Sequence, residues 1–306
     1  MSASFASALN AARDAAAAQH YPQGALYIVA TPIGNLADIT LRALHVLQLA
    51  DTIACEDTRH TQSLLRAYGV EKAGSQLLAV HQHNEAEASQ TVIERLRAGQ
   101  RVAYASDAGT PGVSDPGARL VAAVHAAGLR AVPLPGASSV TAALSAAGAV
   151  SIDVDGFLFA GFLPTKSGER SVAVQKLAAE NRCVILLEAP HRIAELAQAL
   201  AVLGDRPVTL AREITKQFEE IATVAAHALP AWLAEGPQRS RGEFVVLLHP
   251  QANKQDDGDS LRILKLLMQE LPLKTAVKLA AEITGASRNT LYESALALKE
   301  QSDSAN

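Results

Sequence analysis

The sequence has few cysteines and few aromatic residues. Its 306 residues include two cysteines, Cys55 and Cys183, and both stand next to apolar runs. Two separate thiols do not make a disulfide framework, so we expect buried, reduced cysteines and a cytoplasmic protein. Phe, Trp and Tyr together make up 4% of the chain. This low content argues against the aromatic stacking platforms with which RRM and OB-fold proteins bind single-stranded nucleic acid.

The signatures of several other classes are also missing. No Cys/His cluster has the spacing of a zinc site, and no apolar stretch is long enough to cross a bilayer. Residues 1–23 are alanine-rich and lack the features of a signal peptide, which predicts a frayed or helical tail. A GxxxxGK[ST] loop is absent, and no GxGxxG follows the first predicted strand, which disfavours Walker-type NTPases and NAD binding. The net charge of −4 requires any nucleic-acid surface to be local.

Short apolar runs alternate with stretches of helical periodicity. The first set of predicted strands covers residues 25–31, 51–55, 77–81, 102–105 and 130–134. Asp38 is a plausible N-cap for the helix that contains Leu41 and Leu44, and Asn84 with Glu87 resembles a capping box. Strands that alternate with helices predict an α/β fold with a mostly parallel sheet covered on both faces.

A second α/β set follows a cluster of Pro133, Pro135 and Gly136. Its predicted strands are residues 157–161, 183–187, 207–211 and 244–249, and its predicted helices are 168–180, 190–203 and 226–235. We therefore predict a tail (1–23), two α/β domains (24–135 and 136–250) and a polar linker over 251–259.

The C-terminal segment is predicted to be helical, and its basic residues outnumber its acidic ones. Helices are expected over 261–269, 275–283 and 288–298. Gly285 and Ser287 would form the turn of a helix-turn-helix-like module over 260–300, with Arg288, Asn289 and Tyr292 on an exposed helix start. The pattern fits a nucleic-acid-contacting module and equally a helical hairpin that packs on the main body.

Residues 106–117 are the strongest site signal in the chain. Three glycines, two prolines and two aspartates fall directly after the apolar run 102–105. Glycine permits positive φ and close backbone approach, and proline fixes φ, so the loop is shaped. Such loops at the carboxyl ends of parallel strands bind ligands in α/β proteins. The plainer interpretation is a tight turn between strand and helix.

A charged cluster follows the second predicted strand. Glu56, Asp57 and Arg59 stand directly after an apolar run. They would lie at the same edge of the sheet as residues 31–35 and 106–117. The structural alternative is that Asp57 caps the next helix and Arg59 pairs with Glu56.

Several motifs in one order resemble the tetrapyrrole-methylase superfamily of S-adenosylmethionine-dependent methyltransferases, and within it most closely the ribosomal RNA small subunit methyltransferase I family. The matching stretches are residues 26–36, 55–59, 83–85, 106–117, 135–139, 159–164, 188–192 and 212–216. The resemblance runs from residue 25 to about 249 and is looser in the helical tail. It implies two α/β domains with S-adenosyl-L-methionine between them. It also implies a homodimer that 2′-O-methylates a cytidine in the decoding region of 16S ribosomal RNA in the small subunit. Because the sulfonium of this cofactor is already a strong methyl donor, we expect no metal, and the lack of a long apolar stretch predicts no membrane contact.

The resemblance also implies a set of cofactor contacts. Residues 106–117 would hold the methionine part, Asp107 would favour the sulfonium cation, and residues 32–34 would border the methyl acceptor. Ser138 and Ser139 would bind a carboxylate or the adenine edge, or would simply cap a helix. The full set is Pro32, Ile33, Gly34, Ser106, Asp107, Ala108, Gly109, Thr110, Ser138, Ser139, Leu187, Ala211 and Glu213.

Catalysis of 2′-O-methylation needs alignment and a route for one proton. The base candidates are Glu56, Asp57, Glu188, His191 and Glu213, and the sequence does not decide among them. His191 follows Pro190 and would otherwise simply begin a helix. Arg59, Arg192, Arg212 and Lys216 are candidates for binding RNA phosphates.

Two other functions remain open at this point. One is methylation of a tetrapyrrole precursor on the same fold, which would not need the basic helical tail. The other is a non-enzymatic nucleic-acid-binding regulator built on the helix-turn-helix, which leaves both α/β domains without a role.

Overall fold

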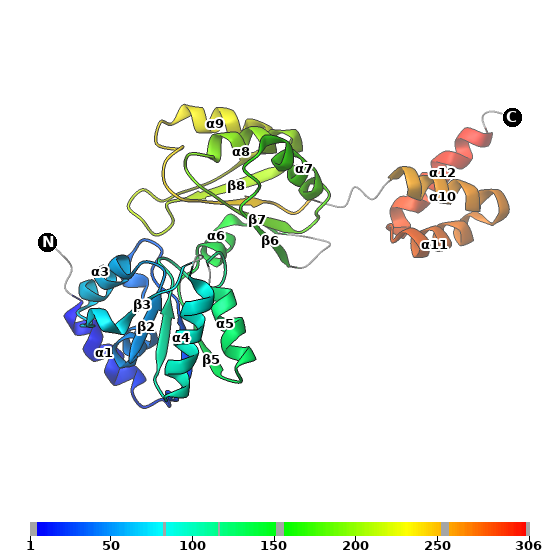
Figure 1. The fold of residues 1–306 in the computed structure, drawn as a ribbon. Coiled ribbons are helices and arrows are strands. Elements are labelled where there is room, and N and C mark those ends of the chain that lie inside the picture. Colours follow the sequence, from blue (N-terminus) through cyan, green and yellow to red (C-terminus); the bar gives the residue numbers. More distant parts are fainter. Residues whose placement is uncertain (1–4, 82–83, 116, 151–155, 252–256, 304–306) are drawn as a thin grey trace. The chain divides into compact units, whose positions relative to one another are not determined.

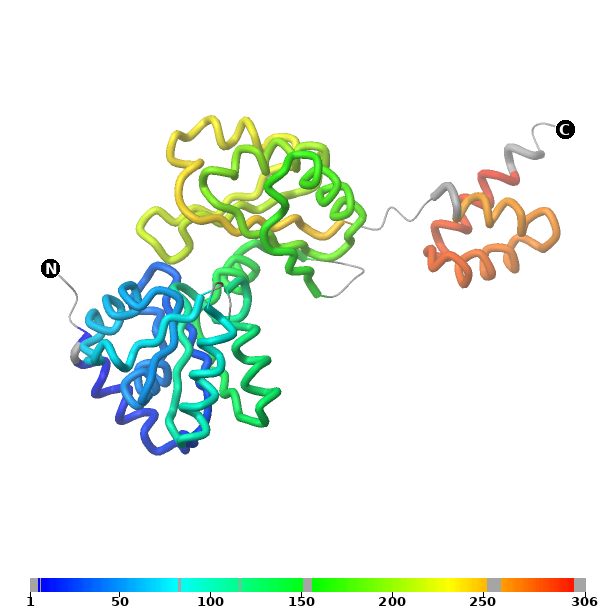
Figure 2. The backbone as a smooth tube through the Cα atoms, in the orientation of Figure 1, coloured from blue at the N-terminus to red at the C-terminus, as the bar shows by residue number. Residues whose placement is uncertain are grey.

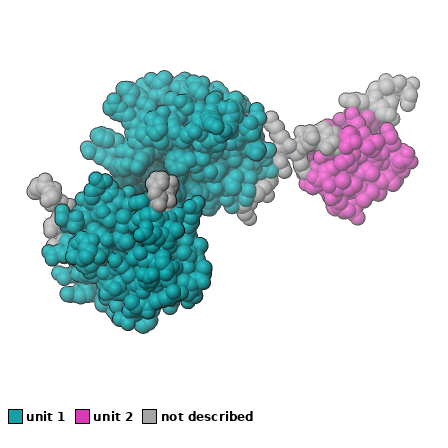
Figure 3. Space-filling view, viewed as in Figure 1, with its two compact units in different colours: residues 1–150, 156–249 teal, residues 151–155, 250–306 magenta. Residues whose placement is uncertain are grey.

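The computed structural model describes residues 5–81, 84–115, 117–150, 156–251 and 257–303. The chain forms two compact units, one of residues 1–150 with 156–249 and the other containing residues 250–306 (Figure 3). The larger unit holds two five-stranded sheets. Many of its helices and strands are labelled in Figure 1, and the path of the chain can be followed in Figure 2.

The first sheet is fully parallel, where a mostly parallel sheet was predicted. Its strands are β1 (Ala25–Val29), β2 (Thr52–Cys55), β3 (Leu77–Ala79), β4 (Val102–Ala105) and β5 (Arg130–Leu134), in the order β3-β2-β4-β1-β5. Apolar side chains alternate across β1, so that Tyr27 joins one core and Leu26 the other. Both faces of the sheet are therefore covered, as the continuous apolar runs predicted.

Helices cover this sheet on its two faces. They are α1 (Ala6–Ala16), α2 (Leu41–Leu49), α3 (Thr58–Tyr68), α4 (Glu85–Arg97) and α5 (Gly117–Ala126), with single-turn helices η1 (Leu36–Asp38) and η2 (Gly74–Gln76). The α1 helix confirms the helical alternative for the N-terminal tail and packs against α2, with Ala12 and Ala16 buried. The first core is thus completed by residues that precede the first strand.

One predicted helix cap is wrong, and another is at the predicted position without the predicted side-chain bonds. Thr40 is the N-cap of α2, because its hydroxyl accepts a hydrogen bond from the Ala43 amide, whereas Asp38 lies in η1. Asn84 is the N-cap residue of α4, but its side-chain oxygen accepts from the His81 amide instead of a helix amide. The capping box with Glu87 is therefore not formed. His83, part of one family motif, lies outside the described residues.

The second sheet is mixed. Its strands are β6 (Phe157–Gly161), β7 (Cys183–Glu188), β8 (Pro207–Arg212), β9 (Glu220–Ala225) and β10 (Phe244–Leu248), in the order β6-β7-β10-β8-β9. Only the β6–β7 pair is parallel, and the pairs made by β10 and β9 are antiparallel. The edge strand β9 was not predicted from the sequence.

Helix α6 (Ser139–Ala147) covers one face of this second sheet, packing with Val140 and Ala143. The other face is covered by α7 (Ser167–Ala178), α8 (Ile193–Leu200) and α9 (Leu229–Glu235), with η3 (Ala201–Leu203) and η4 (Ala226–Ala228) between them. Because β5 ends at Leu134 and α6 packs on the second sheet, we keep 133–136 as the proposed domain boundary.

Both cysteines are buried and free, as expected. Burial raises the pKa of Cys55 to about 11, so that this thiol stays protonated at neutral pH. Within the described ranges, no helix combines the length and the apolar character needed to cross a membrane.

The smaller unit contains α10 (Asp257–Glu270), α11 (Leu273–Thr284) and α12 (Arg288–Asp303). These three predicted helices share a small core that includes Leu264, Ala280 and Leu291. Gly285 ends α11 in the left-handed conformation with φ 73°, as a helix C-cap requires. Of the predicted linker, residues 252–256 lie outside the described residues, and α10 already begins at Asp257.

Candidate functional site

A cavity of about 340 Å³ lies where the loops after the strands of the larger unit meet. Its lining comes from the loops after β1, β4 and β6, from the ends of β7 and β8 and the residues that follow them, and from the starts of α6 and β10. The lining residues are Ile33, Ala108, Ser114, Ser139, Phe162, Leu187, Glu188, Ala189, Pro190, Ala211, Ile214, Glu243, Phe244 and Val245. Most are apolar, with a few polar groups, as in sites for small organic ligands.

The first half of the 106–117 loop is fixed by hydrogen bonds to the end of β1. Thr31 and Gly109 exchange both backbone hydrogen bonds, at 2.9 and 3.0 Å. The Thr31 hydroxyl donates to the Ser106 carbonyl, and the Ser106 hydroxyl donates to the Gly109 carbonyl. Gly109 has φ 82°, a conformation that favours glycine. Ser106 and Gly109 are buried and shape the loop, while Ala108 faces the cavity.

The second half of this loop is closed around Asp115. Its carboxylate accepts hydrogen bonds from the amides of Gly112 and Gly117 and from the Tyr104 hydroxyl. Thr110 ties the loop to the segment before α6, because its hydroxyl donates to the Ala137 carbonyl at 2.9 Å. The shaped loop predicted from the sequence is therefore present, although Pro116 lies outside the described residues.

The charged cluster after β2 adjoins this loop. Glu56 accepts a hydrogen bond from the Asp107 amide, and Asp107 accepts one from the Asp57 amide, both at 3.3 Å. Burial raises the pKa of Glu56. Glu56 and Asp107 therefore join two strand ends, and neither is among the residues that line the cavity.

The structural alternative for Asp57 and Arg59, a helix cap and an ion pair, is confirmed in part. Asp57 caps α3 by accepting from the Arg59 amide, and its carboxylate pairs with the Arg59 guanidinium at 2.9 Å. Hydrogen bonds from the Arg59 side chain and amide lower the pKa of Asp57 to about 2. Arg59 thus pairs with Asp57, where the alternative named Glu56.

Glu188 is the base candidate that lines the cavity. Its side chain is buried, and Oε1 accepts from the Ala189 amide at 2.9 Å and lies 3.1 Å from Arg192 Nε. Oε2 has no hydrogen-bond partner. Arg192 also donates to the Leu163 carbonyl, so that it holds Glu188 in place. His191 is exposed, precedes α8 and is not part of the lining.

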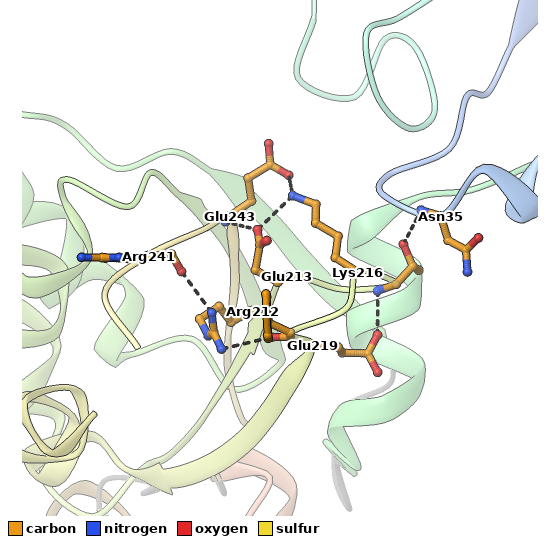
Figure 4. A network of polar contacts seen from close by, with 9 residues as sticks. Asn35, Arg212, Glu213, Lys216, Glu219, Arg241 and Glu243 are labelled. Carbon is orange, nitrogen blue, oxygen red and sulfur yellow. Dashed lines mark hydrogen bonds and ion pairs between the residues drawn. The ribbon is translucent and has the colours of Figure 1, made fainter. Parts of the chain in front are cut away.

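Glu213 and Lys216 form a charged network with Glu243 (Figure 4). Glu243 is one of the residues that line the cavity. Lys216 Nζ lies 2.9 Å from Glu213 Oε1 and 3.0 Å from Glu243 Oε2. Burial alone would raise the pKa of Glu213, but hydrogen bonds from Lys216 and the Glu243 amide lower it. Arg212 is buried and bonded to the Phe218 carbonyl. Neither Arg212 nor Lys216 is therefore a free phosphate ligand.

The cavity unites part of the predicted cofactor set. Ile33, Ala108, Ser139, Leu187 and Ala211 line it. The other members of the set are not among its lining residues: Pro32, Gly34, Ser106, Asp107, Gly109, Thr110, Ser138 and Glu213. Ser138 occupies the N-cap position of α6 without a side-chain capping bond.

Sequence reasoning missed the contribution of β10. Glu243, Phe244 and Val245 stand at its beginning, yet they lie beside the ends of β7 and β8, because β10 is antiparallel to both. The apolar runs 157–161 and 244–249 predict strands, but they do not indicate whether a strand runs parallel or antiparallel to its neighbours. Phe162 and Ile214, directly beyond β6 and β8, were also missed, although the family motifs 159–164 and 212–216 span them. Within the described part of the chain, no group of His, Cys, Asp and Glu could hold a metal ion.

The sequence matches two family models. Residues 25–230 match the model described as Tetrapyrrole (Corrin/Porphyrin) Methylases. Residues 254–299 match the model described as RsmI C-terminal HTH domain.

Similar proteins cover nearly the whole chain. The ribosomal RNA small subunit methyltransferase I of Escherichia coli O157:H7 is 49% identical over 278 residues, which cover 90% of this chain and 95% of that protein. The protein of the same name from Pseudomonas aeruginosa is 47% identical over 279 residues, covering 89% and 97%.

Solved structures share the fold at low identity. A cobalt precorrin-4 methyltransferase aligns with a TM-score of 0.53 and 20% identity, covering 75% of this chain and 98% of its own. A diphthine synthase aligns with a TM-score of 0.54 and 14% identity, covering 78% and 94%. At these identities the likeness concerns the fold of the larger unit.

Proposed function

The chain belongs to the tetrapyrrole methylase family and, within it, to the ribosomal RNA small subunit methyltransferase I family, and from this membership we propose that it transfers a methyl group from S-adenosylmethionine to 16S ribosomal RNA in the small ribosomal subunit. The observation that carries the proposal is the 49% identity over 90% of the chain to a protein of that name. The acceptor we propose is the 2′-hydroxyl of a cytidine in the decoding region.

The cavity suits a ligand with apolar and polar parts. Leu187, Ala211 and Val245 offer an apolar surface for an adenine ring. Ile33, which follows β1, adds another apolar side chain to the lining. The buried Glu188 Oε2 lacks a partner, so a ligand that brings a hydroxyl or a cation to it removes an unsatisfied polar group. S-adenosylmethionine, when bound, supplies an activated methyl group on a sulfonium.

The protein's own part in the reaction is alignment, water exclusion and removal of one proton. We propose that Glu188 accepts the proton of the ribose 2′-hydroxyl at Oε2. This oxygen is buried without a hydrogen-bond partner and belongs to a residue of the cavity lining, whereas Glu56, Asp57 and Glu213 are engaged in hydrogen bonds. Arg192 and the Ala189 amide hold the other oxygen, Oε1, and so orient the carboxylate.

We propose that the smaller unit contacts RNA. Its match to a helix-turn-helix model and its surplus of basic residues support this role. Lys274 and Lys278 are exposed on α11, and Arg288 and Asn289 are exposed at the start of α12. A cytoplasmic location and a homodimer remain predictions.

Transfer of labelled methyl groups tests the function. Purified protein and labelled S-adenosylmethionine are offered small ribosomal subunits, naked ribosomal RNA or a tetrapyrrole precursor. We expect label in the RNA, at the 2′-oxygen of a ribose. Methylation of this oxygen should make the adjacent phosphodiester resistant to alkali. Label in the tetrapyrrole alone would overturn the proposal. Label on a base, with alkali sensitivity unchanged, would refute the 2′-oxygen as the acceptor atom, while RNA would remain the substrate.

A further inference from the structure

Residues 213–216 have an unusual backbone. Glu213 has φ 51° and Thr215 has φ 68°, and among the described residues these are the non-glycine positions with positive φ. Such conformations persist where the surroundings over-determine them, and they cluster at functional sites. Here the Glu213 amide donates to the Glu243 carbonyl at 3.0 Å, and the Thr215 amide donates to Glu219 Oε2 at 2.6 Å.

This segment touches the loop after β1. The Asn35 amide donates to the Thr215 hydroxyl at 3.2 Å (Figure 4). The Lys216 side chain lies directly over Gly34, where an added Cβ would overlap Lys216 Cγ and approach Thr215 Oγ1 to 3.0 Å. Gly34 does not have positive φ, so a glycine is needed here to leave room for Lys216 and not for its backbone conformation.

The ammonium end of Lys216 is fixed by two carboxylates. Glu213 and Glu243 hold it at 2.9 and 3.0 Å. Glu213 in turn packs on Gly242, where an added Cβ would come 2.5 Å from Glu213 Cγ and Cδ. The lysine is therefore held at its tip by the second sheet, while its aliphatic part covers a loop of the first.

Resting on the cofactor site proposed above, we propose that Lys216 is a positioning residue that holds residues 33–35 in place and so fixes Ile33 in the wall of the cavity. Ile33 is next to Gly34 in the chain and lines the cavity. Its Cγ2 would lie 3.3 Å from a Cβ added at Gly109. Contacts thus run from Lys216 through Gly34 and Ile33 to the 106–117 loop.

Two variants break this contact in opposite ways. Lys216→Met keeps the aliphatic part and removes the charge, and Gly34→Ala keeps the charges and fills the space under Lys216. We expect each to raise the Kd for S-adenosylhomocysteine about tenfold, measured by calorimetry. The Kd of the double variant should also rise about tenfold, and not a hundredfold, because both changes disrupt the same contact. Lys216→Arg, which keeps Cγ and can bridge both carboxylates, should bind within about threefold of wild type.

A second readout needs no cofactor. The Asn35 amide should exchange its hydrogen faster in Lys216→Met and in Gly34→Ala than in wild type, because Thr215 no longer holds it. Matched controls are Lys176→Met, an exposed lysine on α7, and Gly168→Ala, where an added Cβ meets nothing within 4 Å. Neither control should change affinity or exchange at Asn35.

The result that would overturn the inference is unchanged affinity and unchanged exchange in both variants. A lower melting temperature without a change in either readout would assign the network a purely structural role. If wild type bound no S-adenosylhomocysteine, the proposed function would fail, and the exchange measurement would still decide whether Lys216 holds the loop.

Discussion

The two sheets of the larger unit contribute to the cavity in different ways. The parallel sheet offers loops whose shape is fixed by their own backbone hydrogen bonds, above all the Thr31–Gly109 pair and the amides around Asp115. The mixed sheet offers charged side chains, with Glu188 in the lining and Lys216 between two carboxylates beside it. The first contribution should therefore be sensitive to backbone conformation and the second to charge.

The largest expected effect is at the backbone of the first sheet. Gly109→Val should abolish binding of S-adenosylhomocysteine, raising the Kd more than about a hundredfold, because a β-branched residue at φ 82° is strained and its Cβ meets Ile33. Gly128→Val is the matched control, with φ 71° and nothing within 4 Å of an added Cβ. It should lose stability and keep its affinity. Equal affinities for the two variants would refute the role of the 106–117 loop.

The next effect is at the charge of the second sheet. Glu188→Gln should lower the methyl-transfer rate about 10²- to 10⁴-fold, the usual contribution of a general base. Affinity for S-adenosylhomocysteine should change less than about threefold, since the amide keeps size and shape. Single-turnover transfer to small subunits measures the rate. Glu195→Gln, on α8 and outside the cavity lining, is the control, and a variant rate as high as that of this control would remove Glu188 from catalysis.

Neither sheet is expected to supply most of the RNA affinity. Lys278→Glu combined with Arg288→Glu in the smaller unit should weaken RNA binding about tenfold at low salt and less at high salt, because phosphate contacts release counterions. Cofactor affinity should not change. Filter binding at two salt concentrations measures this effect. An RNA affinity equal to that of wild type at both salt concentrations would show that Lys278 and Arg288 do not contact RNA.

The smallest effect lies at the far end of β10. Burial lowers the pKa of His249, which follows this strand and lies 2.7 Å from the Thr209 hydroxyl. An unfolded histidine titrates near 6.5, so below about pH 6.5 the unfolded state binds more protons and stability falls as the pH falls. His249→Gln should therefore lose less unfolding free energy than wild type between about pH 7.5 and 5.5, in urea titrations. An identical loss would show that His249 does not titrate differently on folding.

The parallel sheet was the more predictable half. Its buried strands are continuous apolar runs, and the glycines and prolines of 106–117 constrain backbone angles locally, so sequence alone indicates a shaped loop. Helix α1 was harder to place, because an alanine-rich segment such as Ala6–Ala16 gives no sign of what it packs against. Its burial depends on α2, which is distant in sequence.

The mixed sheet was less predictable for a physical reason. An antiparallel strand such as β10 brings its beginning to the edge where its neighbours end, so Glu243 and Val245 join the site although they precede or open their strand. Apolar content does not reveal strand direction. The edge strand β9 is only partly buried, which weakens its apolar signal. Side-chain pairings such as Asp57 with Arg59 depend on distances that spacing alone leaves open.

The most direct test of the account is a crystal structure with S-adenosylhomocysteine. We predict ligand density in the cavity lined by Ile33 and Ala108, from loops of the first sheet, and by Leu187, Ala211 and Val245, from strands of the second sheet, with Glu188 Oε2 left free for the acceptor hydroxyl. Ligand density at another place in the larger unit, with this cavity filled by water alone, would contradict it.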